Sequence, residues 1–386
     1  MATATVLDRL VEQLATLIAI PSVHPLHGGP RAEAAGPLGE AAYARHLADR
    51  LGVLGAEVEL EDVFPDRPNL YATVPGRTDR VVALDCHLDT VSVEHCVGDP
   101  FVATVDDEGR LHGRGACDTK ASIAVLLDLL DEWADRGLRP EPTLLVVGTA
   151  SEEQGGLPGA VAFRGWAEER GLEIEQLMIA EPTSCAPVHG HPGGLALRVH
   201  VTGTAAHTSM PELGRNAIAA AARAIQAVDA ESDRLLARPH PRGTVQTTLI
   251  EGGRAANVVP DECRFTIGRR IAHGEDPAEE QARLESIVAA AVPPCDVSIR
   301  LVNDSRSAAF HQDPASPWVR QLAEWSGTEP CLAPYGSNAL KYGGLAGETV
   351  VLGPGSIEQA HQADEWVDLD ELTRLRSIYE RWLRPG

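Results

Sequence analysis

The sequence predicts a two-domain α/β protein in which a sandwich around a largely parallel sheet is interrupted by a separate α+β unit. Three observations carry this prediction. The chain has 386 residues, which is too long for most single cores. Apolar runs alternate with helical patterns up to about residue 190, and the pattern changes between about 193 and 303. The remainder of the chain then returns to the first pattern.

The first part of the chain contains the elements expected of a covered parallel sheet. After an amphipathic N-terminal helix come NLYATV, VVALDCHLD, the helix TKASIAVLLDLLDEWADRG, TLLVVGTASEE and EQLMIAEPT. VVAL and TLLVV are apolar throughout, as are strands that are covered on both faces. Each run ends in polar residues. Because ligands of open α/β sheets bind beyond the carboxyl ends of the strands, the chemistry should lie there.

The segment 193–303 predicts an inserted domain. GLALRVHVTG alternates apolar and polar residues, which is typical of a half-exposed strand. It is followed by helix RNAIAAAARAIQAVDA, strands TVQTTLI and ECRFTIGRR, helix PAEEQARLESIVAAAV and strand DVSIRLV. The order β-α-β-β-α-β is that of a ferredoxin-like unit, with helices on one face of an antiparallel sheet.

The C-terminal part predicts a return to the first core. Helix SPWVRQLAEWSG, the short strand TVVLGPG and helix LDELTRLRSIYERWL follow the inserted segment. We therefore expect a discontinuous first domain made of residues 1–192 and 304–386.

Composition narrows the classes of partner. The formal net charge is −23, and such an acidic surface repels nucleic acid and anionic lipid. The most apolar run, SIAVLLDLL, is far shorter than the roughly 20 residues that cross a bilayer. The N-terminal segment carries Asp8, Arg9 and Glu12 within its apolar pattern, so we expect no secretion signal and a cytoplasmic protein. Seven widely spaced cysteines without a CxxC pair argue against a disulfide framework or a thiolate zinc site.

Two motifs offer metal-binding or structural roles. In HLDT, strand alternation sends His87 and Asp89 to the same side, where the carboxylate could orient the imidazole; a surface histidine beside an acid is the plain alternative. In GRGACDTK, Asp118 stands just before a helix. It could cap that helix or bridge two cations with its two oxygens.

The other polar groups also follow predicted strands. Glu152 and Glu153 end TLLVVGTASEE, where two adjacent carboxylates raise each other's pKa unless a cation offsets the repulsion. Glu181 follows a short apolar run in MIAEPT, and His361 lies in GPGSIEQAHQADEW beyond the strand TVVL. Each could be an ordinary loop residue. Their coincidence at the strand ends of one sheet favours a site with oxygen and nitrogen ligands, which suits zinc, cobalt or manganese.

HLDT, GRGACDTKAS, TASEEQGG, AEPT and GPGSIEQAHQADEW together resemble the ordered motif set of the M20 family of zinc peptidases and amino-acid deacylases. The similarity covers essentially the whole chain, and the last motif is most similar to the branch of acetylornithine deacetylase and succinyl-diaminopimelate desuccinylase. The resemblance implies a zinc-peptidase-like three-layer α/β catalytic domain with an inserted ferredoxin-like lid and dimerisation domain.

The resemblance also implies the metal ligands. Asp118 would bridge two divalent cations, with zinc expected and cobalt or manganese as alternatives. His87 and Glu181 would complete one site, and Glu153 and His361 the other.

Further roles follow from the same resemblance. Glu152 would be the general base and Asp89 would orient His87. In the inserted domain, His207 of TAAHTS would reach across a homodimer to the scissile carbonyl. Asn257 and Arg270, within NVVPDECRFTIGRR, would bind the substrate carboxylate.

The leading functional prediction is hydrolysis of the amide bond of an N-acyl amino acid, such as acetylornithine. The close alternative is an exopeptidase, a carboxypeptidase or dipeptidase, acting on small peptides, because both reactions need the same activated water. A non-catalytic binding protein of the same fold would have lost Glu152 or a ligand, and all are present. A dehydrogenase is disfavoured because GRGACD lacks the full GxGxxG fingerprint.

Overall fold

The computed structural model describes residues 5–386, with every side chain in that range except that of residue 304. The chain divides into two compact units. The first holds the residues up to His189 together with Gln312–Leu332 and Ser337–Gly386, and the second holds Gly190–His311 and Ala333–Gly336. The predicted inserted segment, 193–303, falls within the second unit.

The main sheet of the first unit has a parallel centre. Its order is β1-β2-β6-β3-β7-β17-β8, and β6, β3, β7 and β17 run parallel to their neighbours within that group. The carboxyl ends of these central strands therefore share one edge of the sheet. The strands are β1 (Glu57–Phe64), β2 (Arg67–Val74), β3 (Val81–His87), β6 (Thr143–Thr149), β7 (Ile174–Ile179), β8 (Val188–His191) and β17 (Ala346–Val351); β16 (Cys331–Leu332) pairs with β8.

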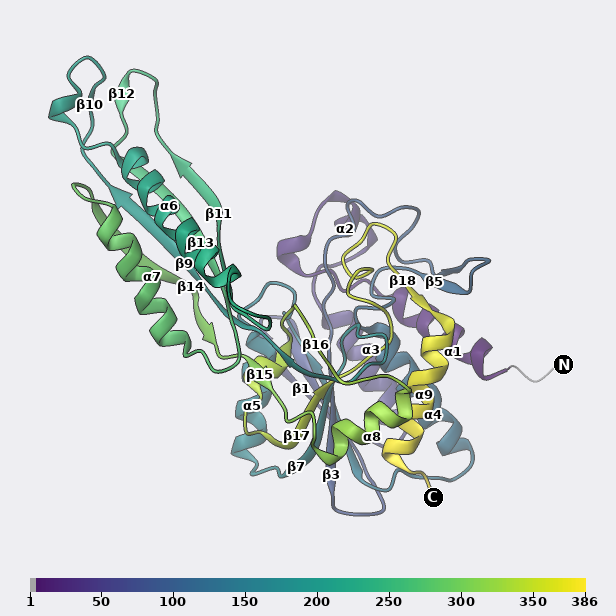
Figure 1. Ribbon diagram of the computed structural model, residues 1–386. Helices are drawn as coiled ribbons and strands as arrows, with labels where there is room; N and C mark the ends of the chain where they lie inside the picture. Colours follow the sequence, from purple (N-terminus) through teal and green to yellow (C-terminus); the bar gives the residue numbers. More distant parts are fainter. Residues whose placement is uncertain (1–4) are drawn as a thin grey trace. The chain divides into compact units, whose positions relative to one another are not determined.

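Helices cover both faces of this sheet (Figure 1). One face carries α1 (Val6–Ile18), α3 (Ala41–Val53), α4 (Lys120–Asp135), α8 (Pro317–Ser326) and α9 (Leu369–Leu383), whose apolar residues share one large buried cluster with the strands. The other face carries α5 (Pro158–Glu169), where the ring of Trp166 stacks on Tyr71 of β2 with 4.2 Å between ring centroids. The first unit is therefore a three-layer sandwich.

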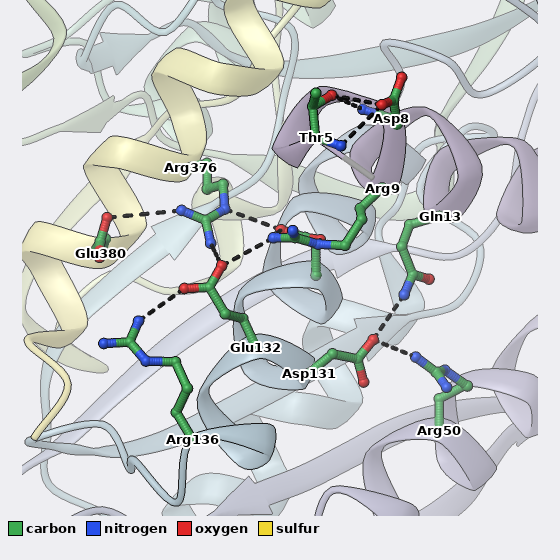
Figure 2. A network of polar contacts seen from close by, with 11 residues as sticks. Thr5, Asp8, Arg9, Gln13, Arg50, Asp131, Glu132, Arg136, Arg376 and Glu380 are labelled. Atoms are coloured by element: carbon green, nitrogen blue, oxygen red, sulfur yellow. Dashed lines mark hydrogen bonds and ion pairs between the residues drawn. The ribbon is translucent and has the colours of Figure 1, made fainter. Parts of the chain in front are cut away.

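A polar network fixes α4 between α1 and α9 (Figure 2). Asp128 of α4 is 2% exposed and pairs with Arg9 at 2.7 Å and with Arg376 at 3.0 Å. Glu132, one turn later, binds the same two guanidinium groups at 2.9 and 2.6 Å. Asp128 and Glu132 are thus each shared by α1 and α9, which holds α4 against sliding along its axis.

The start of α4 is fixed by a buried lysine. Lys120 Nζ donates hydrogen bonds to the carbonyl oxygens of Leu17 and Ile20, at 3.0 and 2.7 Å. These carbonyls lie at and just beyond the C-terminal end of α1, where the helix dipole favours a donor group such as that of lysine. Burial lowers the pKa of Lys120 to about 7. The contact anchors the loop that carries Asp118.

The second unit has its own hydrophobic core. Its sheet is antiparallel in the order β11 (Thr244–Gly252), β13 (Glu262–Ile271), β9 (Gly193–Thr202) and β14 (Asp296–Ser307). Helices α6 (Ala217–Leu236) and α7 (Pro277–Ala291) pack together on this sheet. The element order is the predicted β-α-β-β-α-β, so the predicted fold class, an α/β sandwich with a ferredoxin-like α+β unit, is confirmed.

Short elements complete the fold. In the first unit they are η1 (Pro25–His27), α2 (Pro30–Ala35), β4 (Thr104–Val105), β5 (Arg110–His112), η3 (Asn338–Lys341) and β18 (Trp366–Asp368). In the second unit they are β10 (Ala206–His207), η2 (Pro211–Leu213), β12 (Val258–Val259) and β15 (Phe310–His311). Of the helices between residues 5 and 386, none is both long and apolar enough to span a bilayer.

Candidate metal centre

The polar residues selected from the sequence lie at the carboxyl edge of the parallel strands in the first unit. β3 ends at His87, the loops after β6 and β7 carry three glutamates, and the loop between β17 and β18 carries His361. The loop before α4 adds an aspartate. In chain order the residues so placed are His87, Asp118, Glu152, Glu153, Glu181 and His361.

Asp118 lies at the centre of this group. Its Oδ1 is 2.8 Å from His87 Nε2, and its Oδ2 is 3.2 Å from His361 Nε2. His361 Nε2 is also 3.0 Å from Glu153 Oε2. Ligand atoms of His87, Asp118 and Glu153 all lie within 4.8 Å of one another. The two oxygens of Asp118 thus face two different histidines. A carboxylate that bridges two cations needs this arrangement.

Three glutamates of the group have raised pKa values, which a bound cation would lower. Burial raises the pKa of Glu152 to about 8 and that of Glu153 to about 7, and neighbouring carboxylates such as Asp118 add to both rises. Burial and the charges of Glu152 and Asp118 also raise the pKa of Glu181 well above its usual range. A nearby cation favours the ionised form of such carboxylates, so this cluster suits a cation-binding site.

Two orphaned oxygens support the same conclusion. Oε1 of Glu153 and Oε1 of Glu181 are buried and accept no hydrogen bond from the described residues. Buried acceptors without a partner cost free energy, and a cation bound beside them would supply one. The donor set of imidazole nitrogens and carboxylate oxygens therefore fits a pair of divalent cations such as zinc, cobalt or manganese.

His87 is oriented by the main chain of Asp89. His87 Nδ1 donates to the backbone oxygen of Asp89 at 2.9 Å, whereas the carboxylate oxygen Oδ1 lies 3.6 Å from Nδ1. Nε2 of the same ring lies 2.8 Å from Asp118 Oδ1, where the carboxylate can only accept, so Nε2 is the ring atom that would bind a cation in place of its proton. The carboxylate of Asp89 accepts hydrogen bonds from the backbone N–H groups of Glu152 and Glu153, each at 3.0 Å.

Glu365 is a site residue that the sequence analysis missed. It is 3% exposed and accepts hydrogen bonds from the N–H groups of Gly115, Cys117 and Asp118, at 3.0 to 3.1 Å. Arg114 pairs with the same carboxylate at 2.6 Å. Glu365 thus fixes the loop that presents Asp118. The available signal was an acid four residues after His361 within a Gly/Pro-shaped loop.

The three predicted residues of the inserted segment lie in the second unit. His207 is exposed on β10, and its Nδ1 lies 2.7 Å from Ser209 Oγ. Asn257 is brought beside this strand, because its backbone oxygen accepts from Thr208 N at 3.1 Å. Arg270 is exposed on β13, whereas the neighbouring Arg269 is buried and bound to two glutamates of its own unit. His207 and Asn257 therefore lie close together at the two-stranded sheet of β10 and β12, whereas Arg270 lies on the separate four-stranded sheet.

Known proteins resemble this chain over most of its length. Residues 83–384 match peptidase family M20/M25/M40. An acetylornithine deacetylase of Myxococcus xanthus is 34% identical over 334 residues, covering 83% of this chain and 85% of that protein. A succinyl-diaminopimelate desuccinylase of Methylobacterium nodulans is 29% identical over 403 residues, covering 95% and 93%.

Solved structures share the fold across almost the whole chain. A tripeptidase of Staphylococcus aureus superimposes with a TM-score of 0.78 at 20% identity, covering 98% of each chain. A dinuclear metal-binding peptidase of Bacillus subtilis superimposes with a TM-score of 0.66 at 16% identity, covering 97% of this chain and 96% of that one.

Proposed function

This chain belongs to peptidase family M20/M25/M40, and we propose on that premise that it removes the acyl group from an N-acylated amino acid. Membership makes it a hydrolytic enzyme acting on amide or peptide bonds. The observation that carries the proposal is the position of Asp118, whose two oxygens face His87 and His361. The deacetylase and desuccinylase names of its relatives support an acylated amino acid as substrate.

The five metal ligands would fall into two sets that share one residue. Asp118 would bridge the cations, His87 and Glu181 would complete the first set, and Glu153 and His361 the second. When bound, two divalent cations polarise the scissile carbonyl and lower the pKa of the attacking water. Zinc is the proposed metal, because the ligands are imidazole and carboxylate groups.

The remaining chemistry falls to side chains. Glu152 takes the proton of the attacking water and delivers it to the departing amine, so that the amide C–N bond breaks as the amine leaves. His207 stabilises the negative charge that develops on the carbonyl oxygen. Asn257 and Arg270 bind the substrate carboxylate, and the planar guanidinium is suited to such a bidentate contact.

The test is metal-dependent hydrolysis of a defined substrate panel. Protein stripped with a chelator should lose activity and regain it with zinc, cobalt or manganese, with about two equivalents bound by metal analysis. N-acetyl and N-succinyl amino acids should be cleaved faster than dipeptides and tripeptides of the same residues. A preference for the peptides would replace the deacylase assignment with an exopeptidase, and inactivity on the whole panel with metal bound would overturn the proposal.

We also propose that the chain forms a homodimer through the second unit. β11 is an edge strand of its sheet, and it exposes two successive apolar side chains, Leu249 at 68% and Ile250 at 59%. Exposed apolar edge strands are unusual in monomers, because they offer unpaired backbone groups and an apolar surface to a second chain. A second copy of this strand is an occupant of matching chemistry.

Charged substitution of this strand should give a monomer. We expect the double variant Leu249→Asp and Ile250→Asp to elute as a monomer in size exclusion with light scattering, while the wild type elutes as a dimer. If His207 acts on the partner's site, the monomer should also lose about 10²-fold in kcat. Val53→Asp, on an exposed residue of the first unit, is the control. A monomeric wild type with full activity would contradict both statements.

A further inference from the structure

The loop after β6 contains three consecutive backbone N–H groups that all donate to buried carboxylates. Ser151 N donates to Glu40 Oε1 at 3.0 Å. Glu152 N and Glu153 N donate to the two oxygens of Asp89, each at 3.0 Å. We call these three amides and the carboxylates of Glu40 and Asp89 the amide bracket. It holds the main chain of the proposed base and of a proposed metal ligand.

On the Glu40 side of the amide bracket, the carboxylate is buried and forms an ion pair with Arg67. Glu40 has no exposed surface, and both of its carboxylate oxygens bind the guanidinium of Arg67, one of them to Nε at 2.7 Å. The pair is therefore bidentate, which fixes the plane of the carboxylate as well as its position. A carboxylate fixed in this way presents Oε1 to Ser151 N in one direction only.

Ser151 has an uncommon backbone conformation. Its φ is +64°, in the left-handed region that residues other than glycine rarely adopt, and the residue is fully buried. Such a conformation costs free energy and persists only where surrounding contacts hold it. Here it separates the amide directed at Glu40 from the two amides directed at Asp89.

A histidine holds the side chain of Ser151. His24 Nδ1 accepts a hydrogen bond from Leu26 N at 3.1 Å, so the ring proton lies on Nε2. His24 Nε2 then donates to Ser151 Oγ at 3.0 Å. His24 is buried, and burial lowers its pKa to about 4, in keeping with a neutral ring. Ser151 is thus held at its amide and at its hydroxyl by segments distant in sequence.

We propose that Ser151 and Glu40 are positioning residues that fix the carboxylates of Glu152 and Glu153 through the amide bracket. The inference rests on the proposed function for the roles of those two carboxylates. Asp89 belongs to both halves of the site, since its backbone oxygen holds His87 while its carboxylate holds the two glutamate amides. Asp89 therefore connects the amide bracket to the metal-binding residues. Side chains that are already held in their reactive positions do not have to rearrange during the reaction.

The closing experiment compares Ser151→Ala with Ser151→Gly. Both lack the hydroxyl, so they differ only in how readily the backbone adopts a positive φ. We expect Ser151→Ala to lose about tenfold more kcat than Ser151→Gly, with KM nearly unchanged. Ser151→Val, whose β-branch disfavours this conformation further, should lose about 10²-fold, as for a reacting group displaced by ~1 Å.

Cobalt affinity gives a readout that does not depend on turnover. The Kd of the metal-free protein for Co²⁺, followed by its visible absorption, should rise about tenfold or more in Ser151→Val and less in Ser151→Gly. Asn303→Val is the matched control, because Asn303 also has a positive φ, +55°, but is exposed in the second unit. It should lower the melting temperature without changing kcat or the Co²⁺ affinity.

The outcomes separate the two proposals. If the wild type hydrolyses nothing on the panel, the proposed function fails, and the ranking of Co²⁺ affinities still tests the amide bracket. Equal losses in Ser151→Gly and Ser151→Ala would overturn the role of the left-handed backbone. Folded Ser151→Val with unchanged kcat and unchanged Co²⁺ affinity would overturn the bracket as a whole; if that variant does not fold, the alanine and glycine pair decides.

Discussion

Glu152→Gln should lower kcat by about 10²–10⁴-fold while the protein keeps both metals. Glutamine has nearly the same shape as glutamate but cannot accept the proton of the attacking water. The raised pKa of Glu152, about 8, arises first from burial and then from neighbouring carboxylates, so bound cations are needed to bring it into the range of a base. KM should change little, because the substrate is held by other groups.

Two measurements separate a base from a ligand in this variant. Metal content and Co²⁺ affinity should equal those of the wild type, because Glu152 is proposed to touch the water and not the cations. Glu168→Gln, at a glutamate with a 55% exposed side chain paired with Arg164 on α5, should leave kcat unchanged. A Glu152→Gln enzyme with wild-type kcat, or one that has lost a metal, would contradict the assignment.

Glu365→Ala should destabilise the first unit by about 3–5 kcal/mol, because it leaves Arg114 buried without its carboxylate. Arg114 is 4% exposed, so water cannot replace the lost partner without opening the loop. The amides of Gly115, Cys117 and Asp118 lose their acceptor at the same time. Metal affinity should fall as well, since the loop presents Asp118.

Tryptophan fluorescence during urea unfolding measures the free energy of unfolding of the first unit, which contains Glu365. The six tryptophans all lie in sequence ranges that belong to the first unit. Glu365→Gln should be milder, because an amide oxygen can still accept from the loop. Glu380→Ala, at a glutamate with a 46% exposed side chain, should change stability by about 0.5 kcal/mol or less. A Glu365→Ala protein as stable as the wild type would show that the loop is held by other contacts.

Much of the candidate site could be predicted because the relevant signals are local. His87 is the last residue of an apolar strand, Glu153 and Glu181 each follow one, and parallel strands place such positions on one edge. The structure links four of the site residues in a chain of contacts, in which Asp118 contacts His87 and His361, and His361 also contacts Glu153. Their proposed roles as ligands remain a prediction that metal analysis will test.

The residues that hold the site could not be predicted in the same way. Glu40 stands before a helix in no recognisable motif, and Ser151 reads as an ordinary loop serine. Their importance comes from contacts across long sequence separations, 111 residues between Glu40 and Ser151 and 247 between Glu365 and Asp118. A single sequence carries no signal for which acid meets which amide.

The sequence by itself determined the fold class and the edge of the sheet at which the chemistry lies, because hydrophobic periodicity is set by neighbouring residues. Only the tertiary structure decided which oxygen of Asp89 orients His87, which carboxylate receives each loop amide, and that Ser151 is left-handed. The physical reason is that a buried N–H group donates to whichever acceptor the packing of distant segments brings close to it. That packing depends on the whole chain.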